Sequence, residues 1–114
     1  MFHKCTSLQN LDLSSFNTEN VFYMREMFIS CTSLTELKIK NFNTTNVDSM
    51  KDMFRQCSSL KTLDLAHFEI STNTDMSYMF VGCTSLKLLI LPKIVSTMSP
   101  TNMLSGTDAK VVYQ

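Results

Sequence analysis

The chain has 114 residues, of which 44% are hydrophobic and 18% charged, and its ten basic and ten acidic residues leave no formal net charge. This composition supports a folded core and excludes an intrinsically disordered chain. The lysines and arginines are scattered along the sequence, which excludes the basic stripe of a nucleic-acid-binding protein. No apolar run reaches the roughly 18 residues of a membrane-spanning helix, so we expect no direct membrane insertion by this segment.

One motif recurs along the chain with a spacing of 26 residues. Each copy opens on MFxxC and continues into SLxxLxL, and the first three copies then reach a phenylalanine and a polar segment. A period of this length is typical of repeat proteins, whose units bury their apolar faces by stacking on their neighbours. The sequence predicts one domain over residues 1–114, with units that begin near residues 1, 27, 53 and 79.

The two ends of the chain can be compared with the same motif. Met1 stands at the repeat position of Met27, as expected of an internal methionine in a longer repeat array. Near the other end, Pro100 interrupts the pattern, and the last twelve residues lack both the cysteine and the leucines of the motif. Atypical terminal units are typical of caps, so we expect a C-terminal cap over about residues 92–114.

The SLxxLxL piece of each unit predicts a short β-strand with its leucines on one side. In the first unit these are Leu8, Leu11 and Leu13. The matching leucines of the later units are expected to stack beneath them as parallel rungs. Parallel strands of one sheet need a crossover connection, which is usually helical.

The second half of each repeat predicts that crossover helix, because its apolar residues are spaced three, four and three apart and would share one helix face. In the first two copies these residues are Val21, Met24, Phe28 and Cys31, and Val47, Met50, Phe54 and Cys57. Thr18 or Asn20, and Thr44 or Asn46, are suitable N-caps. In the third copy the Thr-Asn pair comes one residue late, so we expect that helix to start late.

These elements together predict an α/β fold. It is a leucine-rich-repeat solenoid of 26-residue strand-helix units, with a parallel sheet on one face and helices on the other.

The four cysteines are the most regularly placed reactive groups: Cys5, Cys31, Cys57 and Cys83. Rungs of a sheet are about 4.8 Å apart, so a linear column cannot bring four sulfurs to one zinc ion. Neighbouring rungs are close enough for a disulfide, although identical positions hold their side chains parallel rather than facing. We expect buried free thiols that fill the corner between helix and strand. The alternatives are a disulfide and, least favoured, a metal or catalytic site.

The serine column at the same corner consists of Ser7, Ser33, Ser59 and Ser85. A catalytic serine needs a base within hydrogen-bond reach, and the two histidines, His3 and His67, occupy different places in different units. We therefore predict that the serines stabilise the corner, and that the chain is not an enzyme and uses no cofactor or metal.

The positions at which the units differ are the candidates for partner binding, because a residue type that recurs in every unit is expected to stabilise the stack. Two outward columns on the expected strands differ in this way. One consists of Asn10, Glu36, Thr62 and Leu88. The other consists of Asp12, Lys38, Asp64 and Ile90. The adjoining corner residues are Ser14, Lys40 and His67. The alternative interpretation of the charged positions is pairing between strands on a solvated sheet, worth about 0.2–1 kcal/mol per pair.

Leu88 and Ile90 make the fourth strand apolar on the face that is polar in the first three. We expect the C-terminal cap to cover them, with Val111, Val112 and Tyr113 folded against that edge. The alternative is a partner that docks on an exposed apolar patch.

The unit from Ser7 to Cys31, SLQNLDLSSFNTENVFYMREMFISC, resembles the repeat of the BspA-like leucine-rich-repeat surface proteins, in the variant described from mycoplasma surface lipoproteins. The likeness covers roughly residues 1–91. It implies a curved solenoid on the cell surface or outside the cell, used for adhesion to host or matrix proteins or glycans. Fold likeness alone gives only an association with function.

The leading functional hypothesis is a non-enzymatic protein-binding module that contacts its partner through the strand face. The alternative is a structural spacer within a longer array, with no partner of its own. The segment carries no targeting signal of its own, so the surface location follows from the resemblance alone.

Overall fold

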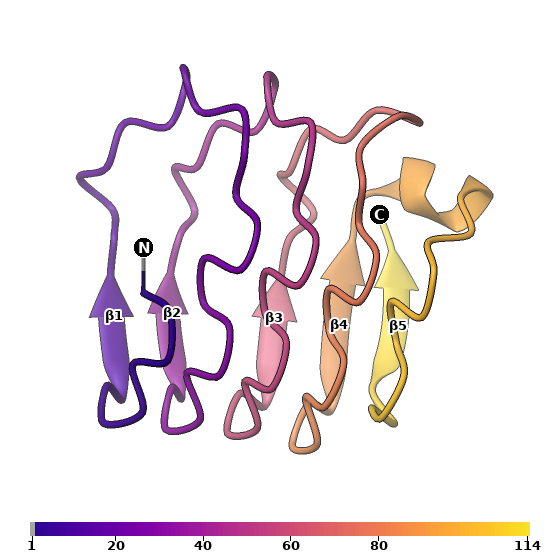
Figure 1. The fold of residues 1–114 in the computed structure, drawn as a ribbon. Coiled ribbons are helices and arrows are strands. Elements are labelled where there is room, and N and C mark those ends of the chain that lie inside the picture. Colours follow the sequence, from indigo (N-terminus) through magenta and orange to yellow (C-terminus); the bar gives the residue numbers. More distant parts are fainter. Residues whose placement is uncertain (1) are drawn as a thin grey trace.

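The computed structural model describes residues 2–114, so Met1 lies outside the described residues. In chain order, the elements are β1 (Asn10–Asp12), β2 (Glu36–Lys38), β3 (Thr62–Asp64), β4 (Leu88–Leu91), the 3-10 helix η1 (Lys93–Thr97) and β5 (Lys110–Tyr113). The chain winds in successive coils, each of which contributes one strand, and the strands lie side by side and point the same way (Figure 1). The coils stack into a molecule of 34 × 31 × 20 Å.

The strands pair in parallel and in the register of the repeat, as the sequence predicts. Leu11 lies beside Leu37, and Leu63 beside Leu89. The pairing forms a two-stranded sheet, β1-β2, and a three-stranded sheet, β3-β4-β5. The hydrogen-bond ladder is therefore interrupted between β2 and β3. The inward leucines of these strands join the core that runs along the stack.

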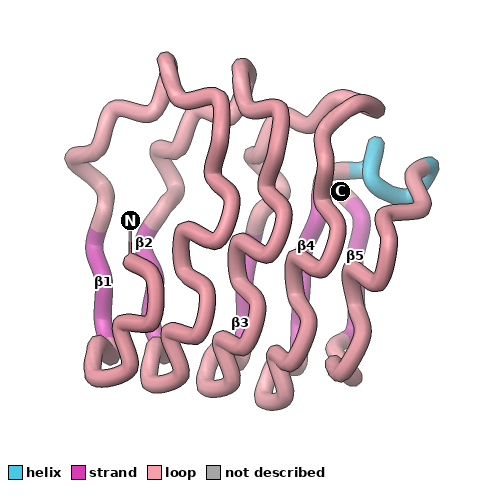
Figure 2. Tube along the Cα trace, viewed as in Figure 1, coloured by secondary structure: helices cyan, strands magenta, loops and turns pink. Residues whose placement is uncertain are grey.

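The prediction of strand-helix units, and with it the α/β leucine-rich-repeat solenoid, is wrong. The described residues contain no α-helix, and the segments predicted as crossover helices run as loops and turns on the side of the molecule opposite the strands (Figure 2). A helix directs each amide to the carbonyl four residues earlier. Here the amides of Met24 and Met50 instead donate to the carbonyl oxygens of Ser49 and Asp75 in the next coil, at 2.9 and 2.8 Å. We call these segments of successive coils the rear ladder.

Backbone conformation explains why the rear ladder cannot be helical. Glu26 and Asp52, in the middle of two predicted helices, have φ angles of 56° and 57°. Near the ends of these segments, Ser30 and Gln56 occupy one repeat position and have φ angles of 58° and 61°. Gly82, with φ 74°, fills the same position in the fourth copy. A left-handed residue cannot continue a right-handed helix, so the apolar spacing of three and four is used by a chain of turns instead.

The spacing between coils excludes helices as well. The rings of Phe2, Phe28, Phe54 and Phe80 stack with centroids 5.7, 5.4 and 5.8 Å apart. Packed helix axes are about 8–10 Å apart, whereas paired strands are about 4.8 Å apart. The coils thus repeat at nearly the spacing of strands on both sides of the core, which leaves no room for a helix in each coil.

The threonines predicted as helix N-caps connect coils instead. The Thr18 hydroxyl donates to the carbonyl oxygen of Asn43 (3.0 Å) and accepts from the amide of the same residue (2.8 Å). Thr44 makes the same pair of bonds with Glu69, at 3.1 and 2.8 Å. Both threonines are buried. The N-cap predictions for Thr18, Asn20, Thr44 and Asn46 are wrong because no helix follows, and the buried hydroxyls stabilise the stack.

The irregularity of the third copy appears in the structure as a displaced turn. Amide-to-carbonyl bonds close the turns Thr18–Val21 and Thr44–Val47, at 3.1 and 3.0 Å. The corresponding turn of the third copy, Ser71–Thr74, is closed at 3.1 Å and falls one residue late relative to the period. The prediction of a late helix is wrong because no helix forms, and the one-residue shift in the sequence appears as a displaced turn.

The predicted cap region, residues 92–114, contains η1 and β5. β5 adds to the sheet by pairing in parallel with β4, with Leu88 beside Lys110 and Ile90 beside Val112. The chain end is fixed by two bonds: the Lys93 amide donates to the Gln114 carbonyl oxygen, and the Gln114 amide to the Leu91 carbonyl oxygen, both at 2.9 Å. β5 therefore pairs with the edge of β4 and does not fold over its outer face.

Candidate protein-binding face

The predicted contact residues lie on the outer face of the two sheets, which we call the strand face. Asn10 lies beside Glu36 and Asp12 beside Lys38. In the second sheet, Leu88 lies between Thr62 and Lys110, and Ile90 between Asp64 and Val112. The two predicted columns are therefore continuous within each sheet, but the ladder does not pair Lys38 with Asp64.

The β1-β2 part of the strand face is polar and weakly paired. Lys38 Nζ lies 3.9 Å from Glu36 Oε1, and both side chains are more than half exposed. An exposed pair of this kind contributes little to stability because solvent screens it and both side chains lose freedom. These two strands also border a shallow hollow of about 140 Å³ lined by Asn10, Asp12 and Lys38. The Lys38 ammonium is thus available to a partner.

Two predicted contact residues are engaged with their own chain. Asp12 Oδ1 accepts bonds from the amide of Ser14 (2.9 Å) and from its hydroxyl. These bonds, with a smaller contribution from the charge of Lys38, lower the pKa of the Asp12 carboxyl. Asp64 Oδ1 accepts from the amide of Ala66 at 3.0 Å. Both aspartates hold the corner at which the strand ends, so a substitution there alters the fold as well as the surface.

His67 also bonds its own chain rather than facing outward freely. Its Nε2 lies 3.0 Å from the carbonyl oxygen of Ile39 in the preceding coil, and its ring meets Phe68 edge-on with centroids 5.0 Å apart. Asn41, one repeat earlier, bonds the carbonyl oxygens of Ser14 and Phe16 in the same manner. Lys40 is exposed at the corner after β2. Of the corner residues, Lys40 is the one whose side chain makes no hydrogen bond within residues 2–114, whereas Ser14 and His67 bond their own chain.

The β4-β5 part of the strand face is apolar. Leu88, Ile90 and Val112 are half-buried there, and Ile90 and Val112 pair directly. We call these three side chains the apolar strip. The cap extends this strip with Val112 and does not cover Leu88 and Ile90, contrary to the sequence prediction, because β5 continues the sheet at its edge.

The cysteines are free, and Cys31, Cys57 and Cys83 are buried as predicted, whereas Cys5 is half-buried in the first coil. The Cys57 and Cys83 thiols donate to the carbonyl oxygens of Phe28 and Phe54, both at 3.1 Å. Burial raises the pKa of the thiols of Cys31, Cys57 and Cys83, that of Cys83 to about 12. A thiol with so high a pKa is a poor nucleophile and a poor metal ligand at neutral pH.

Among residues 2–114, no three His, Cys, Asp or Glu side chains come together as metal ligands would. The same residues contain no helix of the length and hydropathy needed to cross a bilayer.

The sequence interpretation missed a surface of aromatic and basic side chains on the rear ladder. The guanidinium of Arg25 lies 4.9 Å from the ring centre of Tyr23. In the next coils, Lys51 and Arg55 lie 5.7 and 5.9 Å from the ring of Tyr78. No role was predicted for these residues from the sequence. The signal that could have revealed part of this surface was the basic residue at one repeat position in two copies, Arg25 and Lys51.

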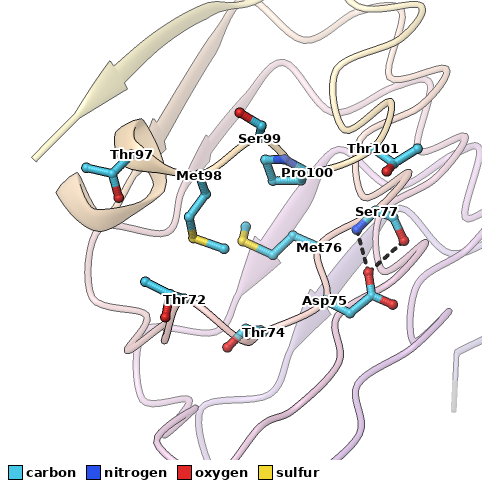
Figure 3. A pocket seen from close by; sticks show the side chains of 10 residues that line it. All are labelled: Thr72, Thr74, Asp75, Met76, Ser77, Thr97, Met98, Ser99, Pro100 and Thr101. Atoms are coloured by element: carbon cyan, nitrogen blue, oxygen red, sulfur yellow. Dashed lines mark hydrogen bonds between the residues drawn. The ribbon is translucent and has the colours of Figure 1, made fainter.

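A pocket of about 400 Å³ lies between the displaced third turn and the cap (Figure 3). Met76 and Met98 point toward one another across it, beside Pro100, and threonine and serine side chains surround them. The carboxylate of Asp75 is held by the Ser77 amide (3.0 Å) and hydroxyl (2.6 Å), which lower its pKa. The pocket forms where the third and fourth copies depart from the repeat, and this departure is visible in the sequence.

One protein family matches nearly the whole chain. A family model described as "Mycoplasma protein of unknown function, DUF285" matches residues 1–109. The chain belongs to this DUF285 family. Its description agrees with the mycoplasma part of the resemblance drawn from the sequence, whereas a BspA-like leucine-rich repeat is not shown. No curated protein and no solved structure gives a significant match.

Proposed function

We propose that the chain is a non-enzymatic protein-binding module of a surface repeat protein, and that it contacts its partner through the strand face. The observation that carries the proposal is the change in chemistry along this face. The outward columns are polar or charged on β1, β2 and β3, and become apolar at Leu88, Ile90 and Val112. An apolar patch rimmed by polar groups is typical of protein interaction sites.

The surroundings of the apolar strip fit a protein partner better than a small ligand. Lys110 and Asp64 flank the strip within the same two columns, and Lys38 and Glu36 lie farther along the face. A central apolar contact with a charged rim is the usual anatomy of a protein interface. The resemblance to BspA-like and mycoplasma surface proteins supports a location on the cell surface and a role in adhesion.

The test measures adhesion of beads coated with the chain to cultured host cells and to immobilised matrix proteins. We expect Ile90→Thr to weaken adhesion about tenfold, which corresponds to about 1.4 kcal/mol of binding free energy. The matched control is Ile94→Thr, because Ile94 is an exposed isoleucine on η1, off the strand face. Equal adhesion of the two variants would contradict the proposal.

A charge reversal separates binding from folding. Lys38→Glu is expected to weaken adhesion several-fold without lowering the melting temperature, because the Lys38 ammonium makes only an exposed contact. Lys93→Glu, on the exposed surface of η1, is the control. Asp64 is unsuitable for this purpose, because its carboxylate accepts a backbone bond and its reversal would also destabilise the corner.

A structural spacer is the second candidate function. The observation that favours it is the engagement of Asp12, Asp64 and His67 with their own chain, which leaves fewer side chains for a partner. Under this alternative, Ile90→Thr and Lys38→Glu would leave adhesion of a longer repeat array unchanged.

A further inference from the structure

The pocket between the displaced third turn and the cap interrupts the rear ladder between the third and fourth coils (Figure 3). Farther along these coils, the amides of Tyr78 and Phe80 donate to the carbonyl oxygens of Thr101 and Met103, at 2.9 and 3.0 Å. At the pocket, no backbone hydrogen bond of the described chain joins residues 72–76 to residues 97–100. We call this break the ladder gap. Both of its walls are coils of the stack, so a coil added at either end would not lie between them.

The third coil presents an open donor and an open acceptor at the ladder gap. One coil earlier, the equivalent groups are the Met50 amide and the Asp48 carbonyl oxygen. Asp75 satisfies both of them, because its carbonyl oxygen accepts at 2.8 Å and its amide donates at 3.0 Å. One repeat later, the Met76 amide and the Thr74 carbonyl oxygen make no hydrogen bond within residues 2–114. The partner that would satisfy them is the main chain of one extended residue.

The path of the fourth coil explains why it does not supply this residue. The carbonyl oxygens of Lys51, Ser77 and Thr101 accept hydrogen bonds at equivalent positions of the rear ladder. The first two are 26 residues apart, but the last two are only 24 apart. Counting back from Thr101, Ser99 is the residue expected to bridge, yet its amide and carbonyl make no hydrogen bond within the described chain. The shortened coil therefore leaves open main-chain groups on both walls.

The side chains at the ladder gap indicate which residue would follow the bridging one. In the second and third coils, the bridging residues Ser49 and Asp75 are followed by Met50 and Met76, whose side chains are buried. Across the gap, Met76 points toward Met98, which is half-buried. Thioether side chains are flexible and polarizable, so they adapt to apolar groups of varied shape. An apolar side chain after the bridging residue would fit between these two methionines.

The rim of the ladder gap is polar. Thr72, Thr97 and Ser99 line it and are exposed, and their hydroxyl groups can both donate and accept. Asp75 adds a carboxylate, which disfavours an acidic side chain at the bridging residue. The volume of about 400 Å³ lies within the usual range of ligand pockets. Open main-chain groups, an apolar floor and a hydroxyl rim together fit a peptide better than a purely apolar ligand.

We infer that the ladder gap binds an extended peptide segment of a partner protein. One peptide residue bridges the Thr74 carbonyl oxygen and the Met76 amide, and the next carries an apolar side chain, such as methionine or leucine, between Met76 and Met98. In strand addition of this kind, main-chain bonds supply affinity and the side-chain pocket supplies specificity. The inference concerns the rear side of the molecule and does not depend on the strand face.

The probe is a fluorescein-labelled peptide NVDSMKD, which is residues 46–52 of the chain and has serine at the bridging position and methionine after it. Its anisotropy should saturate on titration with the full chain. N-methylation of the serine amide removes the donor to Thr74 and should weaken binding at least about tenfold. N-methylation of the last aspartate, beyond the gap, should change binding less than about twofold. Replacement of the peptide's methionine by aspartate should abolish binding.

Hydrogen exchange followed by nuclear magnetic resonance locates the bound peptide. In the free chain, the Met76 amide should exchange faster than the Met50 amide, which is bonded to Asp75. Saturating peptide should slow exchange at Met76 at least about tenfold and leave Met50 unchanged. On the chain, Met98→Glu should abolish peptide binding, whereas Ile94→Glu, a matched change on the exposed side of η1, should preserve it.

Several outcomes would overturn the inference. These are no saturation at millimolar peptide, equal binding of the two N-methylated peptides, and binding that leaves exchange at Met76 unchanged. Slow exchange of Met76 in the free chain would also overturn it, because the fourth coil would then close the gap itself. The peptide comparisons hold even if Met98→Glu unfolds the chain. Ile90→Thr should bind the peptide as the unmodified chain does, and loss of binding in this variant would place the peptide on the strand face instead.

Discussion

Phe54→Ala is expected to lower the free energy of unfolding by about 3–5 kcal/mol, the usual cost of removing a large aromatic side chain from a core. Phe54 is fully buried, and its ring stacks between those of Phe28 and Phe80, at 5.4 and 5.8 Å. Its removal therefore leaves a cavity between two coils and breaks the aromatic stack at its centre. Since small domains have total stabilities of about 5–15 kcal/mol, the variant should be partly unfolded near body temperature. Urea unfolding followed by tyrosine fluorescence measures the change.

The matched control for this prediction is Phe22→Ala. Phe22 is 55% exposed on the rear side of the first coil, and its removal should change stability by no more than about 0.5 kcal/mol. Similar losses in the two variants would show that the phenylalanine column does not form the centre of the core.

Thr44→Val is expected to cost about 1–3 kcal/mol, although the two side chains have nearly the same shape. The buried Thr44 hydroxyl both donates to and accepts from the backbone of Glu69. Valine removes both bonds and leaves the amide and the carbonyl of Glu69 without their partner beside a buried side chain, and the loss of two hydrogen bonds sets the cost. Thermal unfolding followed by calorimetry gives the size of the effect.

The neighbouring residue supplies the control. Thr45 is exposed, and its hydroxyl bonds only the carboxylate of Glu69, at 3.0 Å. Thr45→Val should therefore change stability by less than about 0.5 kcal/mol. If Thr44→Val were no more destabilising than Thr45→Val, the proposed connection between coils through the threonines would be wrong.

The stacking and register of the fold could be predicted from the sequence because the 26-residue period is exact over four copies. Equal spacing places Leu11 beside Leu37 and Leu63 beside Leu89 whatever conformation joins the strands. The interruption between β2 and β3 could not be predicted in this way, because the repeat pattern itself continues across it.

The helix prediction failed because a spacing of three and four residues does not specify a helix by itself. Consecutive turns bury Met24, Phe28 and Cys31 with the same spacing. The amides of Met24 and Phe28 are satisfied by carbonyl groups of the next coil, which a single unit of sequence does not reveal. One signal was present: Gly82 stands directly before Cys83, at the position where Ser30 and Gln56 adopt left-handed backbone angles. A glycine there indicates that the position requires positive φ and that no helix can pass through it.

The strand face was located correctly by the differences between units, but the roles of its residues were not. The repeat positions of Asp12, Asp64 and His67 carry different residue types in different copies. This variation was interpreted as the absence of a structural role. In the structure these side chains bond the backbone at corners. The Asp12 and Asp64 bonds lie within one corner, and the His67 bond reaches the preceding coil, so a change of residue type between copies does not show that a side chain is free.

The central claim of this account is that the rear segments pair with the next coil and are not helical. Nuclear Overhauser contacts on the isotope-labelled chain test it most directly. The account predicts contacts between the backbone of Tyr23 and Ser49 and between that of Ser49 and Asp75, which are bridged in parallel across coils. Regular contacts between residues three apart throughout residues 21–31, with no contacts between the coils, would indicate helices and would contradict it.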